Sequence, residues 1–144
     1  MKTKIILTFL LFLVTISLKA QEWHFDLNEA QKVASEKNQQ IILVFQGSDW
    51  CAPCIKLDKE IWSTQEFIDY SKNNYVMLLA DFPRKKKNKL TDLQQQKNNQ
   101  LMEKYNLRGY FPYVTVLDKN GTVLGSTGYK KISPLEYIKL LNSF

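Results

Sequence analysis

Both cysteines of the 144-residue chain lie in one stretch, Gly47-Ser48-Asp49-Trp50-Cys51-Ala52-Pro53-Cys54. An apolar run, Ile41 to Phe45, precedes this stretch, and an amphipathic segment, Ile55 to Trp62, follows it. Continuous apolar runs of this length are typical of strands buried on both faces, and the later periodicity is typical of a helix. The sequence therefore predicts a strand, a tight loop that carries the cysteines, and a helix.

The Cys-x-x-Cys spacing indicates redox chemistry. If Cys54 lies in the first helical turn, Cys51 lies at the helix N-terminus, where unpaired backbone N–H groups and the helix dipole stabilise a thiolate. We therefore expect the pKa of Cys51 to fall and its nucleophilicity at neutral pH to rise. Cys54 should be more buried and should attack the mixed disulfide that forms on Cys51. Pro53 suits an early helical position.

Other interpretations of the cysteine pair are weaker. A structural zinc site needs four ligands, and the chain offers two cysteines and the single histidine, His24, unless a second chain completes the site. A c-type haem site needs histidine where Ile55 stands. A purely structural disulfide would close a very small loop, which limits its stabilising effect. We expect a redox-active pair with no metal and no cofactor, and a packing or surface role for His24.

The first 20 residues differ from the rest of the chain. Two lysines precede an apolar run at residues 5–18, and Ala20 ends the segment before a polar region. This pattern predicts a secretory signal peptide at residues 1–20 and one domain at residues 21–144. The protein would then be periplasmic or extracellular. The alternative is an uncleaved membrane anchor at residues 5–18, although the run is short for a membrane span.

The positive charge is concentrated in one place. Removing the three lysines of the signal from the 20 basic residues leaves 17 against 14 acidic ones, a net charge of +3. Five of the 17 lie in Arg84-Lys85-Lys86-Lys87-Asn88-Lys89. We interpret this run as a solvated loop rather than a nucleic-acid or membrane patch. No aromatic residue interleaves it for base stacking, so we expect no nucleic-acid partner.

Periodicity and turn signals predict the remaining elements. Helices are expected at residues 27–37, 55–62, 64–72, 92–105 and 134–142, and strands at 41–45, 75–82, 113–117 and 122–126, with residues 23–25 as an edge strand or a packed arm. The early strand–helix–strand unit favours a parallel crossover, and the late hairpin adds an antiparallel edge. The sequence thus predicts an α/β fold with a mixed sheet and helices on both faces.

Helix boundaries are predicted from capping signals. Three capping boxes are expected to begin helices, at Asp26-Glu29, Ser63-Glu66 and Ser133-Glu136, and Thr91 is expected to cap the helix at 92–105. In that polar helix the apolar side is assigned to Leu93, Leu101, Met102 and Tyr105. In the last helix, Leu135, Ile138 and Leu141 or their neighbours are expected to be buried.

Over nearly all of its predicted mature length, the chain resembles the thioredoxin-like proteins, and most of all the small exported ones of bacteria. The motifs that carry the resemblance are Trp50-Cys51-Ala52-Pro53-Cys54 after a strand, Gly109-Tyr110-Phe111-Pro112 entering a strand, the Asp118-Lys119-Asn120-Gly121 turn, and the final helix. The resemblance implies a thioredoxin-like fold.

The resemblance also implies residue roles. Cys51 would be the attacking cysteine and Cys54 the resolving one. Pro112 would be a cis-proline facing the disulfide, and the backbone of Phe111 would pair with a bound peptide. Trp50 and Phe111, with Tyr110 and Tyr113, are expected either to form an apolar rim for extended segments or to pack around the loop.

One departure from the family pattern concerns proton transfer. Thioredoxins usually carry a buried aspartate six residues before the first cysteine, but this chain has Phe45 there. Proton transfer at Cys54 would then use water or another group, such as Asp49 or Glu60. A second departure is that the Gly-to-Pro112 segment is one residue longer than in many relatives.

The sequence predicts an exported thiol–disulfide oxidoreductase that acts on protein disulfides as a monomer, supplied by a membrane or periplasmic electron donor. The reducing direction is favoured because Ala52-Pro53 is close to the Gly-Pro pair of reducing thioredoxins and no histidine lies between the cysteines. The alternatives are a thioredoxin-fold peptide-binding or chaperone module, and a disulfide oxidase or isomerase that uses the same site.

Overall fold

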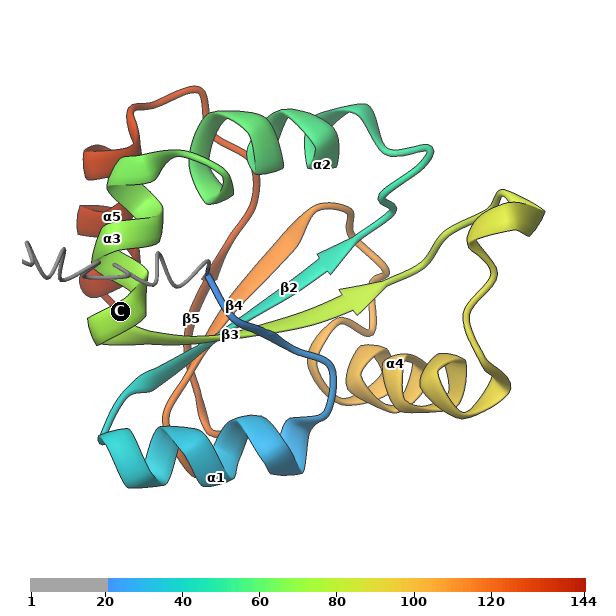
Figure 1. Ribbon diagram of the computed structural model, residues 1–144, viewed down its shortest axis with the longest axis horizontal. Coiled ribbons are helices and arrows are strands. Elements are labelled where there is room, and N and C mark those ends of the chain that lie inside the picture. Colours follow the sequence, from blue (N-terminus) through green and yellow to red (C-terminus); the bar gives the residue numbers. More distant parts are fainter. Residues whose placement is uncertain (1–20) are drawn as a thin grey trace, which may run out of the picture.

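The computed structural model describes residues 21–144, so the predicted signal peptide and its membrane-anchor alternative lie outside the described residues. Five strands form one sheet in the order β1-β3-β2-β4-β5 (Figure 1). Their bounds are β1 (Trp23–His24), β2 (Gln40–Gln46), β3 (Tyr75–Asp81), β4 (Tyr113–Leu117) and β5 (Val123–Thr127). The run predicted as a buried strand thus lies at the centre of the sheet.

Helices cover both faces of this sheet. They are α1 (Leu27–Lys37), α2 (Ala52–Leu57), the π-helical turn η1 (Asp58–Trp62), α3 (Gln65–Asn74), the short 3₁₀ turn η2 (Lys86–Asn88), α4 (Asp92–Tyr105) and α5 (Pro134–Asn142). In Figure 1, α2, α3 and α5 lie on one side of the sheet and α1 and α4 on the other. Among residues 21–144, no helix combines the length and apolar character needed to cross a membrane. The predicted α/β architecture is confirmed.

Strand directions follow the predicted connections. β1 and β2 both pair with β3 in parallel, and β2 is reached from the other side by β4, which runs antiparallel. β5 is antiparallel to β4 and forms the far edge. The turn between them is held by the Asp118 carboxylate, which accepts hydrogen bonds from the backbone N–H groups of Asn120 and Thr122, both at 2.8 Å. Gly121 has a φ of 83°, a conformation that favours glycine.

The core has two layers because β2 sends alternate side chains to opposite faces. Ile42 and Val44 pack with Trp62 under α2, α3 and α5, whereas the odd-numbered residues of the strand pack under α1 and α4. The ring of Trp62 makes edge-to-face contacts with Phe67 and Tyr137, with centroids 4.8 and 5.4 Å apart. Burying each such large side chain stabilises the fold by roughly 1.5–3 kcal/mol.

The π-helical turn corrects one predicted cap. Ser63 was expected to begin the third helix, but the cap is Thr64, whose hydroxyl accepts the backbone N–H of Phe67. In η1 the backbone N–H of Ser63 donates to the carbonyl of Asp58, five residues earlier, so this wider turn absorbs one residue more than the α-helical pattern allows. The hydroxyl of Ser63 instead donates to the Asp58 carboxylate.

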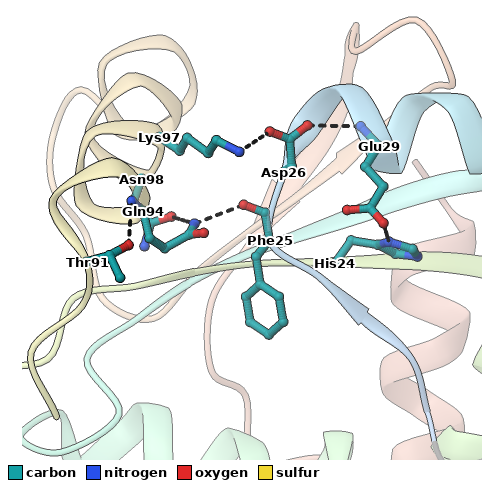
Figure 2. Close-up of polar contacts among 8 residues, drawn as sticks. All are labelled: His24, Phe25, Asp26, Glu29, Thr91, Gln94, Lys97 and Asn98. Carbon is teal, nitrogen blue, oxygen red and sulfur yellow. Dashed lines mark hydrogen bonds and ion pairs between the residues drawn. The ribbon is translucent and has the colours of Figure 1, made fainter.

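The first predicted capping box is half formed. Asp26 caps α1 by accepting the backbone N–H of Glu29 at 3.0 Å. The Glu29 carboxylate does not return to Asp26 but lies 3.7 Å from Nδ1 of the buried His24 (Figure 2). The sole histidine of the sequence is thus packed at the edge of the sheet next to a carboxylate.

Helix α4 has the predicted bounds, but its inward face differs from the prediction. Leu93 is 64% exposed, whereas Asn98 is 1% exposed and donates from Nδ2 to the carbonyl of Asp81 at the end of β3. Gln94 donates to the Asn98 side chain and to the Phe25 carbonyl, and Lys97 lies 2.8 Å from Asp26 (Figure 2). A polar helix therefore docks through hydrogen bonds, which hydrophobic periodicity does not detect.

The last helix shows a related difference. Leu135 is exposed, and Tyr137 is fully buried together with Ile138 and Leu141. The hydroxyl of Tyr137 donates to the carbonyl of Gly128, so this ring satisfies its polar atom while it fills the core. Burial raises the pKa of Tyr137 well above its usual value.

The capping box of α5 provides a test of the local structure. The Ser133 hydroxyl accepts the backbone N–H of Glu136, and the Glu136 carboxylate accepts the backbone N–H of Ser133 at 2.8 Å. Replacing Ser133 with Ala should lower the free energy of unfolding by about 1 kcal/mol, measured by urea denaturation at pH 7. Ser35→Ala is the control, because alanine is favourable inside a helix such as α1.

The pH dependence adds a second criterion. The hydrogen bonds from Ser133 hold the pKa of Glu136 below its usual 4.5. This contribution is present above pH 4.5 and is lost as the pH falls through the lowered pKa, so the difference between wild type and Ser133→Ala should shrink in acid. Equal stabilities of the two proteins at pH 7 would contradict this account of the helix start.

Candidate active site

The predicted site residues gather where the two central parallel strands end. Gly47 follows β2 and Phe82 follows β3, and the backbone N–H of Phe82 donates to the carbonyl of Gln46 at 2.9 Å. In α/β sheets, sites form in the crevice outside the carboxyl ends of the strands. The loop that carries the cysteines therefore stands on the most firmly paired part of the sheet.

Cys51 and Cys54 are joined by a disulfide, with their Cα atoms 5.2 Å apart. Cys51 is the N-cap of α2, as predicted, and its sulfur accepts the backbone N–H of Cys54 at 3.3 Å. Pro53 lies in the first turn. The two residues are 4% and 2% exposed, so the expected deeper burial of Cys54 is only a small difference.

The residues before Cys51 are tied to the end of β3. The backbone N–H and the hydroxyl of Ser48 both donate to the Asp81 carboxylate, at 2.9 and 2.6 Å. The Asp49 carboxylate accepts the backbone N–H groups of Arg84 and Lys85, at 2.9 and 3.0 Å. Sequence reasoning did not identify Asp81, whose only signal is an acidic residue at the end of an apolar strand.

Asp49 therefore works as a structural acceptor. Besides the two backbone groups, it accepts a hydrogen bond from Nδ2 of Asn88 at 2.9 Å. These hydrogen bonds, first that from the backbone of Arg84 and then that from Asn88, hold the pKa of Asp49 below its usual value. The carboxylate thus faces the basic segment at 84–89, and its contacts are with that segment.

Trp50 lies between the cysteine loop and the segment after β3. Its indole Nε1 donates to the carbonyl of Phe82 at 2.7 Å. The ring covers Gly47, where a Cβ atom would come within 2.2 Å of Cε2, so glycine is required for this arrangement. The guanidinium of Arg84 lies 3.6 Å from the ring centroid, a cation–π contact.

Pro112 directly precedes β4, whose first residue, Tyr113, pairs with Phe45 near the end of β2. The Phe111–Pro112 peptide bond is cis, as the resemblance implied. The loop that leads to it is braced by the buried Asn106, whose side chain donates to the carbonyl of Tyr110 and accepts its backbone N–H, at 2.9 and 3.0 Å. Sequence reasoning missed this role of Asn106, which a polar residue directly after a helix could have suggested.

Only part of the predicted aromatic rim borders the site. Trp50 and Phe111 pack edge to face with ring centroids 5.4 Å apart, and Phe82, which was not predicted, extends the row at 5.5 Å from Phe111. The partly buried ring of Tyr113 instead packs on Phe45, with ring centroids 6.3 Å apart. The half-exposed Tyr110 lies beside Tyr113. The rings therefore pack around the loop as one expectation had it, and the rim for extended segments stays a prediction.

The groups around Cys54 bear on proton transfer. Phe45 is fully buried, so the position of the usual carboxylate is apolar. Of the two candidates, Asp49 is held by the basic segment, and Glu60 accepts the hydroxyl of Tyr129 at 2.6 Å. Cys54 shares a small cavity of about 150 Å³ with Asp58 and Gln46. Asp58 lies one helical turn after Cys54 and was not identified from the sequence.

Comparison with known proteins supports this picture. The family model described as the thioredoxin-like domain matches residues 27–144. The chain belongs to this family. It is 32% identical over 115 residues to the disulfide bond reductase DsbH of Chlamydia pneumoniae, covering 80% of this chain and 68% of that protein. A solved structure of a DsbH oxidoreductase matches with a TM-score of 0.79 at 29% identity, covering 90% of this chain and 87% of that one.

A second relative matches over a shorter region. The thioredoxin-related protein DsbJ of Chlamydia pneumoniae is 32% identical over 87 residues, which is 55% of this chain and 25% of that protein. Family membership and the Cys51–Cys54 pair together support the predicted class, a thiol–disulfide oxidoreductase. Within residues 21–144, no cluster of three or more His, Cys, Asp or Glu side chains is arranged to hold a metal ion.

Proposed function

We propose that the chain reduces disulfides in other proteins through Cys51 and Cys54. The observation that carries this proposal is the hydrogen bond from the backbone N–H of Cys54 to the sulfur of Cys51, at the start of α2. In the reduced protein the same donor favours the Cys51 thiolate, which is the attacking form. The relative DsbH is a disulfide bond reductase, which supports the reducing direction.

The exchange runs in two steps. The Cys51 thiolate attacks one sulfur of the substrate disulfide, which forms a mixed disulfide and releases the first substrate thiolate. Cys54 loses its proton and attacks Cys51, which releases the second substrate thiolate and closes the Cys51–Cys54 disulfide. Two electrons pass to the substrate, so an electron donor in a membrane or the periplasm must return two electrons to the pair.

Substrate peptides would lie against Pro112, with the backbone of Phe111 as their pairing partner and the Trp50 ring beside them. Support for this arrangement comes from the edge-to-face contact between Trp50 and Phe111. The braced loop at Asn106 keeps Phe111 in place, which reduces the ordering cost of binding. A rigid edge of this kind suits an extended polypeptide segment.

Asp58 would accept the proton that Cys54 loses in the second step. The two side chains line one cavity, which has room for a bridging water. Asp58 accepts a hydrogen bond from Ser63, much as Glu60 accepts one from Tyr129. Of the three carboxylates considered, only that of Asp58 lines the cavity of Cys54. The exposed Asp58 would therefore take the role that a buried aspartate has in typical thioredoxins.

Residues 21–144 would form the exported domain, acting as a monomer after removal of residues 1–20. The basic start, the apolar run and Ala20 support export. Outside the cytoplasm thiols tend to oxidise, so a protein with this single cysteine pair needs a dedicated reductant to act as a reductase.

A peptide-binding module is the second candidate function. The aromatic groove beside the disulfide favours it, because Trp50, Phe82 and Phe111 line a groove of about 470 Å³ that does not require the cysteines. Under this alternative, a variant with both cysteines replaced by serine still binds peptides.

Trapping tests the proposed exchange. The Cys54→Ser variant of the full chain, expressed in an exporting bacterium, should accumulate mixed disulfides with partner proteins, because Cys51 attacks and nothing releases the partner. Non-reducing electrophoresis and mass spectrometry identify the adducts. The double variant Cys51→Ser/Cys54→Ser is the control and should trap none.

The same preparation tests export. Its intact mass after reduction should correspond to a chain that begins at Gln21. Failure of Cys54→Ser to recover any partner beyond the double variant would contradict the proposed exchange, and a mass that includes residues 1–20 would contradict cleavage.

The role of Asp58 predicts a step-specific defect. In Asp58→Asn, release of the second substrate thiol should slow by at least about 10-fold, the low end of what positioned proton transfer contributes. The initial attack by Cys51 should keep its rate. Stopped-flow mixing with a disulfide peptide resolves the two steps. Glu60→Gln removes the same charge nearby and is the matched control. The proposed role of Asp58 would be contradicted if Asp58→Asn slowed the initial attack and the release step equally, or if Glu60→Gln slowed the release step as much as Asp58→Asn.

A further inference from the structure

The basic loop, Arg84 to Lys89 between β3 and α4, is the feature that the proposed reaction does not use. All six of its residues are exposed, and in Figure 1 this yellow-green segment projects beyond the end of β3. Of the basic side chains in this loop, only Lys89 forms an ion pair within residues 21–144, with the exposed Asp92 at 3.8 Å. Four positive side chains, from Arg84 to Lys87, thus lack an acidic side-chain partner within the described residues.

The loop is nevertheless held in a fixed place. The Asp49 carboxylate binds its backbone at Arg84 and Lys85 and its side chain at Asn88, and η2 adds a turn of 3₁₀ helix. A merely solvated loop has no need of three hydrogen bonds from the residue two positions before the attacking cysteine. These contacts fix the positive charges relative to Cys51.

The loop also borders the aromatic groove. Arg84 covers the Trp50 ring and lines the groove together with Phe82, Met102 and Phe111. Phe111 immediately precedes the cis-proline at which a substrate peptide would lie. A peptide that places its disulfide at Cys51 and runs along Phe111 would therefore contact the apolar side chains of the groove first. Its residues further from the disulfide would contact the positively charged side chains of the loop.

We propose that the basic loop and this groove select protein substrates in which the disulfide is flanked by an apolar residue and then by acidic residues. The inference rests on the proposed reductase function and names its substrate class. Charge complementarity across such a contact mainly raises the association rate and is weakened by salt. The carboxylates of the substrate would face Arg84, Lys85, Lys86 and Lys87.

Two disulfide-bonded peptides test the proposal, with identical apolar residues next to the cysteines and either acidic or basic residues beyond them. The second-order rate constant for reaction with the reduced full-length protein is measured by stopped-flow fluorescence. At low salt the acidic peptide should react about 10-fold faster than the basic one, and 0.5 M salt should remove most of this preference. Neutral hydroxyethyl disulfide serves as the reference substrate for every variant.

A matched pair of charge variants locates the effect. Lys85→Gln/Lys86→Gln/Lys87→Gln should lose most of the preference while its rate with hydroxyethyl disulfide stays unchanged. The control is Lys37→Gln/Lys72→Gln/Lys119→Gln, which removes the same charge at the opposite end of the central strands. There α1 and α3 end and β4 turns into β5. The control should keep the preference.

The variant Asp49→Ala tests whether the preference depends on the position of the basic loop or on the net charge of the protein. The variant is more positive than wild type, so a net-charge effect would increase the preference for the acidic peptide. The proposal predicts a decrease, because the loop loses its attachment beside Cys51.

Three results would overturn the proposal: equal rates for the two peptides, equal losses in the two triple variants, or an increase in Asp49→Ala. Stoichiometric binding of a single-stranded oligonucleotide that the loop variant abolishes would also overturn it, by assigning the loop to nucleic acid. Failure to react with any disulfide, including hydroxyethyl disulfide, would instead overturn the reductase function itself.

Discussion

The attachment of the cysteine loop to the end of β3 is the constraint on which the site depends. Ser48 is held by Asp81, Asp49 by the backbone at Arg84 and Lys85, and Trp50 by the carbonyl of Phe82. Each of these contacts joins parts of the chain more than 30 residues apart. They fix where α2 starts, and therefore where the sulfur of Cys51 lies relative to the cis-proline loop.

The same attachment links the position of Cys51 to the positions of the aromatic groove and the basic loop. Because Asp49 and Trp50 precede Cys51 directly, the contacts that orient the thiol also position the aromatic groove and the basic loop. Cys54 and Asp58 line a separate cavity, which shares no residue with the aromatic groove.

Much of this arrangement could be predicted from the sequence, because its signals are local. The caps at Asp26, Thr91 and Ser133 each act over a few residues, and the predicted bounds of α1, α4 and α5 followed from them and from helical periodicity. The π-helical turn was not predictable, since it breaks the periodicity that caps are counted from. Polar contacts between distant segments, such as Asn98 with the Asp81 carbonyl and Asn106 with Tyr110, leave no periodic signal either.

In the proposed reaction, Cys51 and Cys54 form a redox pair that donates electrons to a substrate disulfide. The most direct test is the reduction potential of the purified protein, obtained by equilibration in glutathione buffers with the fluorescence of Trp50, next to Cys51, as the readout. We expect a two-electron transition at a low potential of about −270 mV, the value for thioredoxin. A potential near about −120 mV, typical of a strong oxidant, would contradict the reducing direction, and the absence of a two-electron transition would contradict the enzymatic function as a whole.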